Sequence, residues 1–284
     1  MTNAKISVVI PLYNKEPIIS KTLHSVLHQD YAEYEIIVVD DGSTDMSYEI
    51  ACKIKNEHEK GDLISIIQQK NAGPGAARNT GVKNARGEWI VFLDADDELL
   101  ENALSVFSEI IEKHDDIDII DANKIILTGE SKQLNYHPLE GYVKNPLREC
   151  FFGKIMPGNG SSAFRKEFML RNLYNEQIRR FEDAELLIRH LPEARVFSIK
   201  TPTLLFNRNF ASASHPRKDV MEDYFAYLDF KKRGFWRKMC VYKTFLEERE
   251  LYPEYGKVHY SSMYWRYDML LTFKFLNLIS ALFK

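Results

Sequence analysis

The stretch "VFLDADDELL", Val91–Leu100, decides the fold, because an apolar run leads directly into three carboxylates, Asp94, Asp96 and Asp97. Together with the two apolar residues in front of it, this run is typical of a strand buried on both faces of a sheet. Carboxylates at a strand end can hold a divalent cation, cap a following helix or lie in water. The surrounding sequence has to distinguish these alternatives.

Similar β-branched apolar runs occur three more times in the first 120 residues, and helical patterns separate the four runs. The order β-α-β-α-β-α-β predicts a parallel sheet with right-handed crossovers. In the second helix, Ser43 is the expected N-cap and Asp45 lies in the first turn. The predicted strands are Ile6–Ile10, Glu35–Asp40, Leu63–Ile67 and Trp89–Asp94, and the predicted helices cover residues 17–29, 43–60 and 73–85.

A polar cluster follows each predicted strand: "PLYN", "DDGSTD", "QQKNAGPGAARN" and "DADDE". Parallel strands present their carboxyl ends along one edge of the sheet, where ligands of such sheets bind. We therefore expect the four clusters to converge on one site. Residues 123–220 are less regular and predict a mixed part of the sheet with one helix, "EDAELLIRHL" (182–191).

The composition bounds the class of protein. The chain has 284 residues, 45% of them hydrophobic, and a net charge of −3, which does not favour a nucleic-acid partner. The three cysteines are far apart, without metal-ligand spacing, and favour a reducing compartment. No signal peptide is visible and no apolar run approaches the roughly 20 residues of a membrane span. We expect a cytoplasmic protein.

The cluster "DADDE" has two interpretations. One aspartate suffices to cap the helix expected to start here, with Glu98 in its first turn, so three carboxylates exceed that need. Oxygen-only ligands suit Mg²⁺ or Mn²⁺, and a carboxylate pair at a strand end can hold a divalent ion bound to a diphosphate. The spacing does not fit an EF-hand, because Leu99 takes the glycine position.

The other clusters are also open to two interpretations. "DDGSTD" is a polar turn, or supplies a carboxylate to a base or ribose. "NAGPGAARNTG" is neither a dinucleotide fingerprint nor a P-loop, and a packed small-residue helix does not explain its Asn71 and Arg78. In "FEDAELL", Glu182 and Asp183 either suit the helix dipole or include a general base.

Taken together and in order, "VVIPLYN", "IIVVDDGSTD", "NAGPGAARNTG", "WIVFLDADDEL" and "FED" resemble glycosyltransferase family 2, whose members are inverting enzymes with the GT-A fold. The similarity runs from Ser7 to about Leu99 and resumes around Ser161–Leu187. It implies an α/β, GT-A-type fold in residues 1–216, with a largely parallel central sheet flanked by helices. A helical C-terminal extension is expected in residues 217–284.

The resemblance also implies roles for individual residues. Asp94 and Asp96 match the family's D-x-D motif, which implies Mn²⁺ or Mg²⁺ on Asp96, with Asp94 near the ribose and the metal. Asp97 is an extra carboxylate that shares either role. Asp183 matches the catalytic base, with Glu182 beside it. The residues similar to nucleotide-sugar contacts are Pro11, Tyr13, Glu16, Asp41, Asn71, Arg78, Asp94 and Arg208.

The implied reaction is the transfer of a single sugar from a nucleotide-diphosphate sugar, expected to be a UDP-sugar, to an acceptor hydroxyl with inversion. Two departures from the family pattern matter. Phe210 stands where a histidine often follows the downstream arginine, and the nearest histidine is His215. "QIRRF" (177–181) precedes the "ED" motif and lacks tryptophan, so we interpret its likeness to the Q-x-x-R-W motif of processive synthases as chance.

The C-terminal region adds expectations about partners. Residues 229–284 carry 11 Lys/Arg against 6 Asp/Glu. The basic stretch 231–243 favours peripheral contact with anionic lipid at the inner face of a membrane. The apolar segment 269–284 predicts a helix that packs on the body, on a second subunit in a homodimer, or on lipid. The implied acceptor is a glycan or lipid-linked oligosaccharide in surface polysaccharide synthesis.

Two rival functions share the fold class. A catalytically inactive nucleotide-sugar-binding protein is disfavoured by the intact Asp94, Asp96, Arg78 and Asp183. A sugar nucleotidyltransferase usually has a Gly-rich basic loop after the first strand, which "PLYNKEP" lacks.

Overall fold

The computed structural model describes residues 5–210 and 234–251, together with 272, 274 and 276. Its strands are β1 (Ile6–Leu12), β2 (Tyr34–Asp40), β3 (Ile64–Gln68), β4 (Trp89–Phe92), β5 (Glu98–Leu99), β6 (Ile119–Thr128), β7 (Ser131–Asn135), β8 (Gly141–Tyr142), β9 (Ser162–Arg165) and β10 (Val196–Asn207). Its α-helices are α1 (Ile19–Leu27), α2 (Ser47–Glu57), α3 (Pro74–Asn84), α4 (Ala103–Lys113), α5 (Pro146–Phe151), α6 (Lys166–Arg171), α7 (Glu182–His190) and α8 (Phe235–Leu251). Short 3₁₀ turns occupy η1 (Gly61–Leu63), η2 (Leu191–Glu193) and η3 (Arg208–Phe210).

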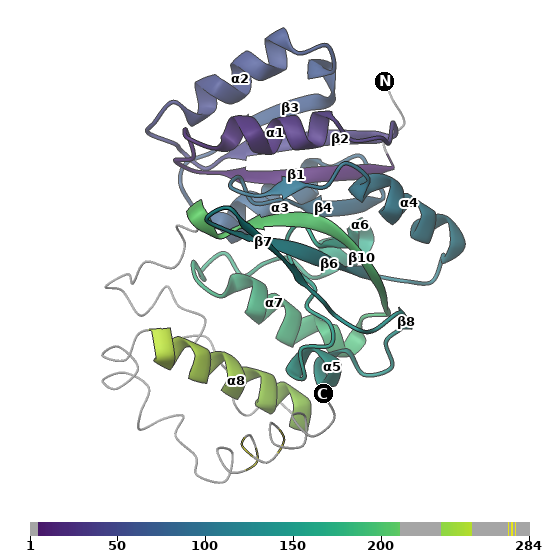
Figure 1. The fold of residues 1–284 in the computed structure, drawn as a ribbon. Helices are drawn as coiled ribbons and strands as arrows, with labels where there is room; N and C mark the ends of the chain where they lie inside the picture. The colour runs from purple at the N-terminus through teal and green to yellow at the C-terminus, as the bar shows by residue number, and fades with distance from the viewer. Residues whose placement is uncertain (1–4, 211–233, 252–271, 273, 275, 277–284) are drawn as a thin grey trace.

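The strands form one sheet in the order β3-β2-β1-β4-β9-β6-β10-β5 (Figure 1). The four N-terminal strands are parallel, so all four strands predicted for this half are confirmed. In the other half, β9 runs antiparallel between β4 and β6, while β6 and β10 are parallel. The mixed part of the sheet predicted for residues 123–220 is therefore confirmed as far as residue 210, where this described stretch ends. The expectation of one helix in this region is wrong, because α5 and α6 are present in addition to α7.

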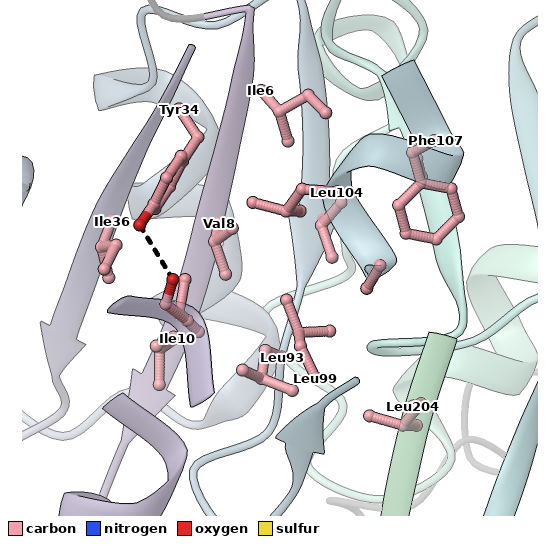
Figure 2. Packing of buried hydrophobic residues seen from close by; sticks show 14 of the residues in the cluster. Ile6, Val8, Ile10, Tyr34, Ile36, Leu93, Leu99, Leu104, Phe107 and Leu204 are labelled. Atoms are coloured by element: carbon pink, nitrogen blue, oxygen red, sulfur yellow. Dashed lines mark hydrogen bonds between the residues drawn. The ribbon is translucent and has the colours of Figure 1, made fainter. Parts of the chain in front are cut away.

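Side chains of the central strands alternate between two hydrophobic clusters, as a strand period of two requires. Val8 points into the cluster covered by α1 and α4, and Val9 into the cluster covered by α3, α6 and α7. Figure 2 shows the first cluster, in which the buried Tyr34 hydroxyl donates a hydrogen bond of 2.9 Å to the Val26 carbonyl oxygen. The buried faces leave the strand ends as the place for polar chemistry.

The described part of the C-terminal extension packs on the body. In Figure 1, α8 lies alongside α7, and its residues Met239–Tyr242 are buried. The Cys240 thiol donates to the Leu147 carbonyl oxygen at 3.4 Å, and Lys243 donates to that of Phe151 at 3.1 Å. Leu276 also packs against the second cluster, whereas all other residues of 269–284 except 272 and 274 lie outside the described residues. Among the described residues, no helix is both long and apolar enough to cross a bilayer.

Two predictions about helix starts are wrong. Helix α2 begins at Ser47 rather than after Ser43, because the Asp45 carboxylate accepts the Ser47 amide N–H at 3.0 Å and fixes the turn there. Glu98 does not begin a helix. It lies in β5, which pairs antiparallel with β10, and α4 starts only at Ala103. The structure therefore does not use the "DADDE" carboxylates as helix caps.

Candidate active site

The site lies at the carboxyl ends of the parallel strands, and Arg78 on α3 is at its centre. The Arg78 side chain is only 4% exposed. One guanidinium nitrogen donates to Asp94 at 2.8 Å and the other to Glu182 at 2.9 Å, with Asp183 3.6 Å away. The guanidinium also lies over the Tyr174 ring at 5.3 Å. One buried cation thus joins the predicted metal motif to the predicted catalytic pair.

Asn159 makes a second connection between the same two motifs. Its amide nitrogen lies 3.2 Å from Asp94 and 3.2 Å from Asp183. Asn159 lies in "PGNGSS" (157–162), within the part of the sequence that shows no regular pattern. Gly160 next to it has φ +70°, and a Cβ there would lie 2.3 Å from Leu204. The glycine permits the close approach that presents Asn159 to the site.

The side chains of the adjacent residues Glu182 and Asp183 differ in their exposure to solvent. The Glu182 side chain is 11% exposed and is paired with Arg78, whereas the Asp183 side chain is 40% exposed. Burial is the main cause that raises the pKa of Glu182 to about 7, and the negative charge of Asp183 is the next. The positive charge of Arg78 acts in the opposite direction. Burial also raises the pKa of Asp183. Asp183 is thus the more accessible carboxylate of the two. A raised pKa makes a carboxylate a better proton acceptor.

The backbone in front of this pair is constrained. Phe181, the N-cap of α7, has φ 58° and ψ 23°, which is left-handed and uncommon for an aromatic residue. This conformation starts α7 directly at Glu182, so both carboxylates sit in the first turn, where the helix dipole favours negative charge.

The three aspartates after β4 point to different partners. Asp94 accepts hydrogen bonds from Arg78 and Asn159. Asp96 accepts one from the Lys15 ammonium, with 2.5 Å between Lys15 Nζ and Asp96 Oδ2. Asp97 is 2% exposed and accepts the backbone N–H of Asn207 at 2.7 Å. Burial, followed by the charge of Asp94, raises the pKa of Asp97 to about 8. Asp97 therefore ties the D-x-D loop to β10, and its share in the ribose or metal role stays a prediction.

Asp94 and Asp96 fit a divalent cation in donor type, since carboxylate oxygens suit Mg²⁺ and Mn²⁺. Lys15 already places a positive charge against Asp96. Within the described parts of the chain, however, no three His, Cys, Asp or Glu side chains form a cluster able to hold a metal. A cation here would need further oxygens, which a diphosphate provides.

Another part of the site forms around the loop between β3 and α3. Asp41 is 3% exposed, and its carboxylate accepts the amide N–H groups of Ala72 and Gly73 at 2.9 and 2.8 Å. Asn71 accepts a hydrogen bond of 2.8 Å from Arg179. A Cβ at Gly73 would lie 3.2 Å from the Arg179 side chain. Base contact by Asp41 and Asn71 stays a prediction, and Arg179, from the "QIRRF" segment, was missed.

The remaining predicted residues lie in or just beyond the ends of strands. Pro11 is in β1, and Tyr13 beyond it is 44% exposed. Glu16 accepts the Met46 amide N–H at 3.3 Å, which joins the first loop to the second. Arg208 is exposed in η3, directly after β10. Contact of these residues with a nucleotide stays a prediction, and His215 lies outside the described residues.

A family profile described as "Glycosyl transferase family 2" matches residues 7–171, more than half of the chain. Among curated relatives, "Glycosyltransferase GlyA" of Streptococcus pneumoniae is 42% identical over 118 residues, covering 41% of this chain and 16% of that protein. "Poly(ribitol-phosphate) beta-N-acetylglucosaminyltransferase TarS" of Staphylococcus aureus is 37% identical over 112 residues, covering 39% and 19%. The matched region thus spans less than a fifth of either relative.

Solved structures show the same fold. S. aureus TarS 1–349 in complex with UDP-GlcNAc superposes with a TM-score of 0.62 at 21% identity, covering 86% of this chain and 66% of that one. GalNAc-T7 with UDP, GalNAc and Mn²⁺ gives 0.54 at 19% identity, covering 69% and 42%. The curled mixed sheet flanked by helices is that of these neighbours, and the α/β fold class of the sequence analysis is confirmed.

Proposed function

The chain belongs to glycosyltransferase family 2, and on this premise we propose that it transfers a single sugar from a UDP-sugar to an acceptor hydroxyl with inversion. The observation that carries the proposal is the arrangement of Asp183 beside Asp94, with Arg78 and Asn159 between them. It brings an accessible carboxylate together with the motif at which the family holds its donor. A general base must lie within hydrogen-bond reach of the hydroxyl that it deprotonates, directly or through one water.

In this proposal, individual residues of the site have distinct roles. Asp183 accepts the proton of the acceptor hydroxyl, which attacks the anomeric carbon as the bond to the diphosphate breaks. Arg78 and Asn159 fix the position of Asp183 and of Asp94, and a fixed geometry lowers the entropic part of the barrier. Glu182 holds the Arg78 guanidinium. Asp41, Asn71 and the loop that they order are proposed to receive the base, and Arg208 the diphosphate.

Asp94 and Asp96 are proposed to hold Mn²⁺ or Mg²⁺, which when bound neutralises negative charge growing on the leaving diphosphate. The Mn²⁺ in the GalNAc-T7 structure supports this choice of ion. UDP as the nucleotide is supported by the UDP-GlcNAc bound to TarS.

The acceptor is proposed to be a hydroxyl of a surface polymer or of a lipid-linked oligosaccharide. Support comes from the name of TarS, which acts on poly(ribitol-phosphate). Attachment to the inner face of a membrane through the C-terminal region and assembly as a homodimer remain hypotheses, as does the division at residues 216 and 217.

The test is a panel of UDP-sugars with Mn²⁺, scored for sugar transfer or slow hydrolysis. The D183N variant should lose about 10²–10⁴-fold in turnover, as expected for loss of a general base. It should still bind UDP, because Asp183 is assigned to the acceptor side. Binding without turnover in the wild type across the panel would favour the inactive donor-binding alternative, and release of pyrophosphate would indicate a nucleotidyltransferase.

A further inference from the structure

Lys15 forms an ion pair with Asp96, one of the two predicted metal ligands. Its ammonium lies 2.5 Å from Asp96, and the two side chains are only 16% and 15% exposed. The sequence analysis gave Lys15 no role, since it stands between Tyr13 and Glu16 in the first loop without matching either family contact.

The backbone of Lys15 is held firmly in place. Its amide N–H donates to the Ser47 hydroxyl at 2.7 Å. Its carbonyl oxygen accepts the amides of Ile18 and Ile19 at 3.0 and 2.9 Å, at the start of α1. A fixed backbone keeps the ammonium at high local concentration next to Asp96.

The Asp96 side chain is only 15% exposed, and a carboxylate this far removed from water is stabilised by a positive partner. Lys15 supplies that partner. Asp94, the other member of the pair, is already bonded to Arg78 and Asn159. Both carboxylates of the motif therefore carry partners supplied by the chain itself.

We propose that Lys15 is a built-in competitor of the divalent cation at Asp96, so that the cation binds tightly only together with a nucleotide diphosphate. The inference rests on the proposed metal at Asp94 and Asp96. An ammonium in contact with a carboxylate both blocks its oxygen and repels a second cation. A diphosphate adds negative charge that attracts the metal and also accepts the displaced ammonium, so donor and metal replace Lys15 together.

The experiment measures Mn²⁺ binding to the full chain by electron paramagnetic resonance, with and without UDP. K15M removes the ammonium and keeps side-chain length, and it should bind Mn²⁺ without UDP roughly tenfold more tightly than the wild type, since contact repulsion is lost. K15R keeps the charge and should remain weak. The matched control K21M changes an exposed lysine on α1 and should equal the wild type.

The outcomes separate this inference from the function on which it rests. Equal or weaker Mn²⁺ binding by K15M without UDP, while the wild type binds Mn²⁺ with UDP, overturns the competitor role alone. Mn²⁺ binding that survives in D96N, or no binding by any variant even with UDP, overturns the metal assignment and the competitor role together. Melting curves keep the comparison independent of folding, because Mn²⁺ should raise the melting temperature of K15M more than that of the wild type.

Discussion

The substitution R78M tests whether one buried cation stabilises the site. Methionine keeps much of the side-chain volume but removes two hydrogen bonds, 2.8 Å to Asp94 and 2.9 Å to Glu182. It leaves three carboxylates close together, since Asp183 is 3.6 Å from the same guanidinium. Removing one partner of a buried ion pair costs about 3–5 kcal/mol in the free energy of unfolding.

The solvent exposure of the three carboxylates around Arg78 determines where in the range of about 3–5 kcal/mol the loss should fall. The Asp94 and Asp183 side chains are 32% and 40% exposed, so water can solvate part of their charge after the substitution. The Glu182 side chain is 11% exposed, so water can solvate less of its charge. We therefore expect a loss of about 3 kcal/mol at pH 8, at the lower end for a broken buried pair.

The loss should depend on pH in a defined direction. The pKa of Glu182 is about 7 in the folded protein, raised from 4.5. A raised folded-state pKa gives stability that is fully present below 4.5 and is lost as the pH rises through about 7. Without Arg78 the pKa rises further, so protonation relieves the repulsion at pH 5.5. The difference between R78M and wild type should shrink by about 1 kcal/mol or more there.

Urea unfolding followed by the fluorescence of buried Trp89 measures this difference at both pH values. The control K113M breaks an exposed pair with Glu109 of 3.7 Å and should change stability by less than about 0.5 kcal/mol. A loss below about 1 kcal/mol at pH 8, or an equal loss at both pH values, would refute the reasoning on Arg78.

Three further predictions concern positions outside the proposed catalytic pair. D97A should cost about 1–3 kcal/mol in chemical denaturation, because the Asn207 N–H loses its acceptor. D97N keeps an acceptor and should abolish the loss of stability that the wild type shows as the pH rises through about 8. G81A should cost about 1–3 kcal/mol, since its Cβ would meet Val9 at 2.2 Å, and adding V9A should show favourable coupling in a double-mutant cycle. Deleting residues 269–284 should release the protein from anionic liposomes, and unchanged co-sedimentation would contradict the membrane hypothesis.

The strands of the N-terminal half were predictable because each is rich in β-branched apolar residues, and β2 and β4 are buried along their whole length, although Ser65 and Gln68 of β3 are exposed. Every residue of β2, including Asp40 at its end, is buried. Helix starts were less predictable because single hydrogen bonds decide them. Asp45, rather than Ser43, fixes the start of α2, and Ser and Asp are about equally good caps by type.

Glu98 shows a different limit. The sequence from Glu98 onward has helical character, but two of its residues pair with β10, more than 100 residues later. Such a pairing is invisible to local periodicity, because tertiary contacts override local propensity. The same long-range contact explains Asp97, whose buried partner is the backbone of Asn207.

The proposed catalytic pair was recognisable as a motif, but the difference between its two members was not. Glu182 and Asp183 are neighbours of similar chemistry in the first turn of α7, and only their surroundings separate them. Arg78 binds Glu182 directly, whereas Asn159 reaches Asp183 from a loop with no recognisable motif. A carboxylate held by a buried cation keeps that cation in place, and a carboxylate left 40% exposed can meet a substrate. The assignment of Asp183 as the base therefore depends on contacts across sequence separations of 24 to 105 residues, which only the folded chain supplies.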